Sequence, residues 1–320
     1  GKQTKDNTYG VIDIDGAFRG SDWQIAYQFA RPFENSKGDY AASVGFKSIS
    51  QTWGSQFRFR AIGNDFKINQ VGFVPWRGTL NSVLLTGPIW YFEEGMIKNM
   101  FLFFGPGINY EHADLYTDYS GVLGFNMQFR KGWGYEIDLD FGKSKDEEIH
   151  YDSYSINLNS WFDISQIWSA NAWGGYQKTY NFGRNYLASY AWAGFSANWK
   201  ALNILTVGTS YDMFIENNPD GNIEDITYNA RPFLSFTPIN NLNLRVYVDN
   251  VFVRSTDRME RIIGGFLFSW NFLPKSWIYL AINEFRDRSN EYDVNNNLLP
   301  NRMHTTDRAG VFKIKYLYYF

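Results

Sequence analysis

Cysteine is absent from this sequence of 320 residues, so the chain can hold neither a disulfide framework nor a thiolate metal site. Long hydrophobic runs are also absent. A membrane-spanning helix needs about 18 or more apolar residues, whereas the longest apolar segments, at 100–108 and 262–268, are short and carry glycine. A helical membrane protein is therefore excluded. Basic residues form no cluster longer than two and the net charge is −3, so nothing indicates nucleic acid as a partner.

Aromatic residues are abundant, at 19% of the chain, and they stand in segments where apolar and polar residues alternate. A period of two is typical of strands, and no segment shows the 3.6-residue period of a helix. In 241–254, one face would carry Leu242, Leu244, Val246 and Val248, and the other Asn243, Arg245, Tyr247 and Asp249. The alternation recurs at 23–30, 56–61, 135–141 and 153–159. The chain is therefore expected to be all-β.

A soluble sandwich would show the same alternation, but three features favour a membrane. The expected strands are about ten to sixteen residues long, whereas soluble strands average about 5–6 and membrane strands need about 9–11. Aromatic residues gather at strand ends, as in the girdles of outer-membrane barrels. Short turns alternate with longer polar connections at 111–118, 143–152, 217–224 and 286–306. We therefore predict a single transmembrane antiparallel β-barrel domain of about 16–18 strands over 1–320, in a bacterial outer membrane.

The alternation allows about seventeen strands to be placed. Their expected starts are Tyr9, Asp22, Asp39, Gly54, Thr79, Lys98, Thr117, Gly134, His150, Gln166, Asn185, Asn203, Ile223, Asn241, Met259, Trp277 and Asp307. Bacterial single-chain barrels have even strand numbers. One strand is therefore expected to be split or missed, and the N-terminus is where this fits best.

The last strand carries alternating apolar and aromatic residues up to the chain end, at Ile314, Tyr316, Tyr318 and Phe320. This pattern resembles the signal read by the barrel-assembly machinery of diderm bacteria. In a soluble protein, such an aromatic edge strand would invite aggregation. The pattern implies a periplasmic C-terminus with the long loops extracellular. Because the sequence starts at Gly1 rather than Met, we expect a signal peptide upstream, and an N-terminal domain could precede the barrel.

Two segments carry a distinctive pattern. The first, at 62–78, reads IGNDFKINQVGFVPWRG and contains Asp65-Phe66, Gly72-Phe73-Val74 and Arg77. The second runs from SWIYLAINEFRDR at 276–288 to DRAGVFKIKYLYYF at 307–320. Both resemble an uncharacterised family of Bacteroidota outer-membrane barrels, whose members typically carry an N-terminal domain similar to carbohydrate-binding module family nine. Gly78 departs from the family pattern, in which an acidic residue follows the arginine. The resemblance implies a barrel and assigns no catalytic residue.

Segment 64–78 is longer than a turn and unusually apolar for a loop exposed to water. By the expected strand order it lies on the external side, and it contains Phe66, Gly72, Phe73, Val74, Pro75, Trp76 and Arg77. Two interpretations are open. Either the segment is a plug in the lumen or a lid over its mouth, or the strand expected at Thr79 begins earlier, near Gln70, with a bulge at Gly72.

Charges of both signs fall on the face expected to line the lumen, namely Arg58, Arg60, Glu136, Asp138, Asp140, Arg245, Asp249, Lys313 and Lys315. Unpaired charges would be costly in a dry interior, so the lumen must be wet or the charges must pair. One hypothesis is a selectivity filter of opposed arginine and carboxylate rows. The alternative is structural, with charge ladders across neighbouring strands that fill the barrel.

Metal binding and catalysis find little support in the sequence. His112, His150 and His304 fall in expected connections near carboxylates, but their spacing forms no compact ligand motif. Neither a Gly-x-Ser-x-Gly elbow nor a His-Glu-x-x-His helix is present. We therefore predict no metal, no cofactor, no catalytic residue and no enzymatic activity.

The sequence favours a porin-like or gated channel that works with protein partners in a Bacteroidota-type envelope. The alternative is a non-conducting scaffold or anchor barrel of a larger outer-membrane complex. A soluble all-β binding domain is a third class, which predicts solubility without detergent. The expected partners are outer-membrane lipid and lipopolysaccharide, the barrel-assembly machinery and other envelope proteins.

Overall fold

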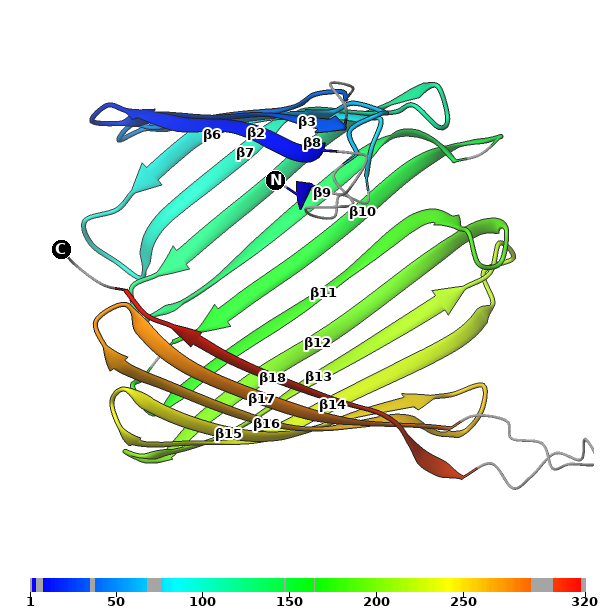
Figure 1. Cartoon of the computed structure of the whole chain (residues 1–320). Helices are drawn as coiled ribbons and strands as arrows, with labels where there is room; N and C mark the ends of the chain where they lie inside the picture. The colour runs from blue at the N-terminus through cyan, green and yellow to red at the C-terminus, as the bar shows by residue number, and fades with distance from the viewer. Residues whose placement is uncertain are drawn as a thin grey trace, which may run out of the picture. The chain divides into compact units, whose positions relative to one another are not determined.

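The computed structural model describes residues 2–3, 8–34, 38–67, 76–146, 148–163, 165–288 and 302–317. In these residues the chain is all-β, and long neighbouring strands run antiparallel (Figure 1). No helix long and apolar enough to cross a membrane occurs in the described part of the chain. The chain divides into two compact units, one of Gly1–Arg130 with Tyr135–Asn157, and one of Lys131–Gly134 with Leu158–Phe320. The prediction of a single domain stays a prediction.

The first unit holds the N-terminal strands and most of the ninth, and each strand from β2 onward pairs with the next in sequence. The strands are β1 (Lys2–Gln3), β2 (Thr8–Arg19), β3 (Trp23–Glu34), β4 (Ala41–Ile49), β5 (Trp53–Ile62), β6 (Thr79–Tyr91), β7 (Ile97–Glu111), β8 (Tyr116–Phe129) and β9 (Trp133–Asp146). Strand β10 (Ile149–Phe162) pairs with β9, and its residues up to Asn157 belong to this unit.

The second unit continues the same up-and-down order from the end of β10. Its strands are β11 (Trp168–Asn181), β12 (Tyr186–Leu202), β13 (Leu205–Asn217), β14 (Ile223–Ile239), β15 (Leu242–Val253), β16 (Arg258–Leu273), β17 (Ser276–Arg288) and β18 (Met303–Lys315). With β1 set aside, the described residues form seventeen strands of 9 to 17 residues. The predicted all-β antiparallel fold and its strand number are confirmed.

Strand β1 precedes the seventeen long strands, and at two residues it is too short to be the further membrane strand that was expected near the N-terminus. It pairs with β2, with Lys2 opposite Tyr9 and Gln3 opposite Thr8. Two residues are too few to display an alternation, which explains why seventeen strands were placed. Counted with β1, the described strands number eighteen.

The two faces of each unit differ in the way the alternation predicts. On β15, Val246 and Val248 are 47% and 43% exposed on one face, while Arg245, Tyr247 and Asp249 point to the other. In the first unit, β2 exposes Ile12 and Ile14 and turns Asp13 to the opposite side. We call the side with large aliphatic and aromatic residues the apolar face of each unit, and the opposite side its polar face.

An apolar core of the usual kind is missing from the described residues. The buried hydrophobic residues are Phe66, Phe103, Tyr180, Ala188 and Ile226, whereas dozens of large hydrophobic side chains are exposed. A soluble protein of this size rarely exposes so much contiguous apolar surface. The apolar face therefore needs a non-aqueous surrounding.

Three polar connections predicted as long are short, because the strands continue into them. Strand β9 runs to Asp146 and β10 starts at Ile149. In this extension the backbone N–H of Lys145 donates to Asp118 on β8, and Ser144 contacts Ser153 on β10. A strand end whose polar side chains form hydrogen bonds to neighbouring strands has the same polar sequence as a loop. The connections at 112–115 and 218–222 are short for the same reason, and of the intervals between described strands only 63–78 and 289–302 are long.

Candidate functional site

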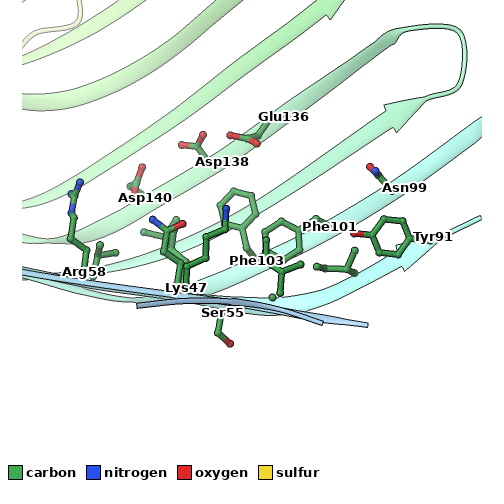
Figure 2. Close-up of a pocket in the computed structure, with 17 residues that line it drawn as sticks. Lys47, Ser55, Arg58, Tyr91, Asn99, Phe101, Phe103, Glu136, Asp138 and Asp140 are labelled. Carbon is green, nitrogen blue, oxygen red and sulfur yellow. The ribbon is translucent and has the colours of Figure 1, made fainter. Parts of the chain in front are cut away.

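The polar face of the first unit is hollowed by a cavity of about 630 Å³. The six successive strands β4 to β9 contribute its lining, and side chains of opposite charge lie on different strands (Figure 2). Lys47 and Arg58 come from β4 and β5, whereas Glu136, Asp138 and Asp140 come from β9. The structure thus brings four of the predicted lumen charges, Arg58 and the three carboxylates, into one site.

The three carboxylates form a row because they occupy every second position of one strand. Each accepts a hydrogen bond from a neutral side chain of a neighbouring strand. Asn126 donates to Glu136 at 2.7 Å, Asn157 donates to Asp138 at 2.7 Å, and Ser155 donates to Asp140 at 3.1 Å. These bonds hold the carboxylates in place and leave their negative charge uncompensated.

The cations opposite are equally uncompensated. Among the described residues, no ion pair involves Lys47, Arg58 or Arg60. Figure 2 shows Arg58 and Lys47 projecting from their strands toward the side where the β9 carboxylates lie. The arrangement separates positive from negative charge across a hollow, which creates a field across it.

Between the two charged sides the wall is mostly apolar, with Asn99 as its polar member. Phe101 and Phe103 lie on β7 with ring centroids 5.4 Å apart, and Ile89 and Tyr91 continue this surface on β6. The ring of Phe103 occupies the space that a Cβ at Gly124 would need, so it lies flat against the wall. Flat packing keeps the hollow open despite the large side chains.

A second cavity of about 310 Å³ lies on the polar face of β2–β5. Asp13, Gln28 and Arg60 line it, and Gln28 donates to Asp13 at 2.9 Å. Phe66 belongs to the connection between β5 and β6, yet it also lines this cavity and is only 4% exposed. The start of the connection therefore folds over the polar face.

The base of this connection is fixed by backbone hydrogen bonds. Gly78 donates to Gly63 at 3.2 Å, and His112 donates to Gly78 at 2.7 Å. Gly78 has a φ of 69°, which favours glycine at this position. Trp76 is 64% exposed and Arg77 is exposed, while Gly72, Phe73, Val74 and Pro75 lie outside the described residues. Strand β6 begins at Thr79, so Trp76–Gly78 add nothing to it.

The remaining predicted charges lie in the second unit. Asp249 is 3% exposed and pairs with Arg231 of β14, and Arg245 packs over the ring of Phe233. Lys313 and Lys315 are exposed on β18, where the Lys315 ammonium lies 5.1 Å from the ring centroid of Trp277. One cross-strand ion pair thus involves a predicted residue here, unlike in the first unit.

The C-terminal signal residues are placed only in part. Ile314 and Tyr316 are exposed on the apolar side of the chain end, and Tyr316 stacks on Phe272 at 6.4 Å. Tyr318 and Phe320 lie outside the described residues. Within the described part of the chain, no group of three or more histidine and carboxylate side chains could hold a metal ion.

Sequence reasoning missed Lys47 and Arg231. Both lie within strands, Lys47 between Phe46 and Ser48 on β4, and Arg231 between Ala230 and Pro232 on β14. The proline next to Arg231 obscured the strand, because proline removes a ladder hydrogen bond. A strict assignment of alternate positions on β4 and β14 would have found both residues.

No protein-family model and no curated protein matches the chain. Among solved structures, the chain is similar to an anion-selective porin from Comamonas acidovorans, at 10% identity over 96% of this chain and 98% of that one, with a TM-score of 0.46. It is also similar to the NanC porin, at 13% identity over 62% of this chain and 94% of that one, with a TM-score of 0.33. Likenesses this weak define neither the fold nor the function of this chain.

Proposed function

We propose that the chain is a β-barrel of a bacterial outer membrane that conducts small solutes through a polar lumen. The observation that carries this proposal is the difference in polarity between the two faces of the sheet. Large apolar side chains are exposed on one face of each strand, and the charges of the first unit gather around a hollow on the other. Lipid satisfies the first face and water satisfies the second.

Strand length supports a membrane crossing. The strands from β2 to β18 have 9 to 17 residues, and a tilted strand needs about 9–11 to cross the hydrocarbon layer. In lipid the backbone hydrogen bonds of a sheet must all be made. A closed barrel meets this requirement, because it has no free edge.

The charges of the first unit support a wet lumen. Arg58 and the carboxylates of Asp138 and Asp140 line one cavity, and none of the ion pairs between described residues involves them. Charges left unpaired in a dry interior would shift the balance strongly against folding. Opposed charges in water instead select solutes by charge.

Phe66 supports a narrowed lumen. Its ring is buried against the polar face although its segment connects two strand ends. We propose that Phe66 reduces the open cross-section on the side of the long connections, which we place outside the cell. The C-terminus would then be periplasmic.

The proposal also covers the surroundings of the barrel. Lipid and lipopolysaccharide would cover the apolar face, and the barrel-assembly machinery would insert the chain. Partner proteins and a Bacteroidota-type envelope rest on the sequence resemblance alone.

Conductance in planar lipid bilayers tests the proposal. Purified protein added to one chamber should produce discrete, reproducible current steps in 1 M KCl. A protein that shows a heat-dependent gel shift, and therefore is folded, but never conducts would contradict the channel and favour the scaffold or anchor barrel. Solubility without detergent would contradict the membrane barrel itself.

A further inference from the structure

The polar face of the second unit carries a row of directly paired residues across six strands. From β12 to β17 the row consists of Asn198, Gly208, Phe233, Tyr247, Gly265 and Asn283. Two aromatic residues stand at its centre, and a glycine flanks each of them. The hydroxyl of Tyr247 donates to Asn283 at 2.8 Å, which fixes one ring.

The glycines allow both rings to lie against the wall. A Cβ at Gly208 would collide with the ring of Phe233, and a Cβ at Gly265 would collide with the ring of Tyr247. The two rings therefore lean away from each other over β13 and β16. Each offers a face to the space beside the sheet.

An arginine covers each ring from the opposite strand. The guanidinium carbon of Arg245 on β15 lies 3.7 Å from the ring centroid of Phe233, and that of Arg231 on β14 lies 5.7 Å from the ring centroid of Tyr247. Each arginine stands two positions from a ring on its own strand and reaches diagonally to the other. Stacking on a ring orients the planar guanidinium along the wall.

The carboxylate of Asp249 pairs with Arg231. Arg231 directs both Nε and Nη2 at Oδ2 of Asp249, whose side chain is 4% exposed. Among the described residues, no carboxylate pairs with Arg245, and its buried Nε has no hydrogen-bond partner. The cluster therefore holds one uncompensated positive charge on an oriented guanidinium.

A buried hydrogen-bond donor without a partner costs free energy, so such a donor in a native structure usually has an identifiable role or an additional partner. A carboxylate would satisfy Arg245 well, because the guanidinium fork matches the two oxygens of a carboxylate. The neutral side chains nearby, Ser235 opposite Arg245 and Asn243 beside it, suit a hydroxylated carbon chain.

We propose that Arg245, held on Phe233 and backed by the Arg231–Asp249 pair, binds small hydroxylated organic carboxylates on the polar face of the second unit. The proposal deepens the proposed function and rests on it, because dissolved anions reach Arg245 only if this face is bathed in water. The channel would then retain and pass sugar-acid-like anions in preference to neutral polyols.

Calorimetric titration of the detergent-solubilised protein tests the site without requiring conduction. Gluconate is the probe, and sorbitol, which has a neutral group in place of the carboxylate, is its control. We expect saturable gluconate binding on the order of millimolar and none with sorbitol. Arg245→Met should weaken gluconate binding about tenfold or more, and Arg245→Lys should weaken it less, because the ammonium keeps the charge but loses the fork.

Arg308→Met is the matched control. It removes the same charge from the same unit, but Arg308 pairs with Glu284, which shares the apolar face with Ile282. Gluconate binding should remain unchanged. A heat-dependent gel shift confirms that each variant is folded, and an unfolded Arg245→Met leaves Arg245→Lys to decide.

The outcomes separate this inference from the proposed function. Current steps without gluconate binding would overturn the site and leave the channel intact. Gluconate binding that Arg245→Met and Arg308→Met weaken equally would also overturn the site. Gluconate binding that is lost only in the Arg245 variants supports the site. If such binding were found without any conductance, the site would stand and only the proposed channel would be contradicted.

Discussion

Neutralising the carboxylate row of β9 should lower the selectivity of the channel for cations over anions. The variant Glu136→Gln/Asp138→Asn/Asp140→Asn removes three negative charges that line the cavity and keeps side chains of similar size. The cations Lys47 and Arg58 remain on the opposite side. The field in the cavity then comes mainly from positive charge.

The size of the effect follows from Coulomb's law. A charge about 7 Å from an ion in water contributes roughly 0.6 kcal/mol, and screening in 0.1 M salt halves this to about 0.3 kcal/mol. Three charges acting oppositely on cations and anions change their relative free energy by about 1.8 kcal/mol. The cation-to-anion ratio in the cavity should therefore fall by up to roughly twentyfold.

Reversal potentials across a KCl gradient in planar bilayers measure this ratio. In 1 M salt the Debye length shrinks to about 3 Å, so the same variant should differ from the wild type by no more than about twofold. Glu284→Gln, on the apolar face of the other unit, is the control and should leave the ratio unchanged. A triple variant with wild-type selectivity in 0.1 M salt would refute the placement of the carboxylates along the ion path.

Three further predictions concern single side chains. Phe66→Ala should raise single-channel conductance in the same bilayer recordings, because Phe66 is buried on the polar face, whereas Trp76→Ala, at an exposed residue, should not; equal conductances would contradict a constriction at Phe66. Arg231→Met should lower the free energy of unfolding in urea by about 3–5 kcal/mol, because Asp249 would stay buried without its partner, and adding Asp249→Asn should recover most of the loss. Val248→Arg should destabilise the protein in lipid vesicles by up to about 2–4 kcal/mol, and an unaffected variant would argue against lipid at this face.

Strand positions were predictable because alternation is a local property of the sequence. All but one of the predicted starts lie within two residues of the observed ones; the exception is β18, which begins at Met303 rather than Asp307. Polar residues such as Thr305 and Thr306 hide the start of β18, and the same effect made the strand ends beside Asp146 and Asn217 look like loops. The length of a polar stretch in the sequence therefore does not show whether it is a loop or a pair of strand ends whose polar side chains form hydrogen bonds across the sheet.

The site was predictable only as a set of charges on one face. Glu136, Asp138 and Asp140 follow from alternation, but their position opposite Lys47 depends on the register of six strands, which the sequence does not display. The stacking of Arg245 on Phe233 was also invisible, since the two residues are twelve positions apart and meet only through the pairing of β14 with β15.

Alternate labelling along β10 tests the central claim most directly, namely that one face of the sheet meets water and the other meets lipid. The chain has no cysteine, so single substitutions give a clean background. In vesicles, a water-soluble maleimide should label Ser155→Cys and Asn157→Cys quickly, because these side chains lie on the polar face beside the β9 carboxylates. Tyr154→Cys and Ile156→Cys, on the apolar face, should resist labelling until detergent is added. Equal labelling of all four variants in intact vesicles would contradict the membrane barrel and its water-filled lumen.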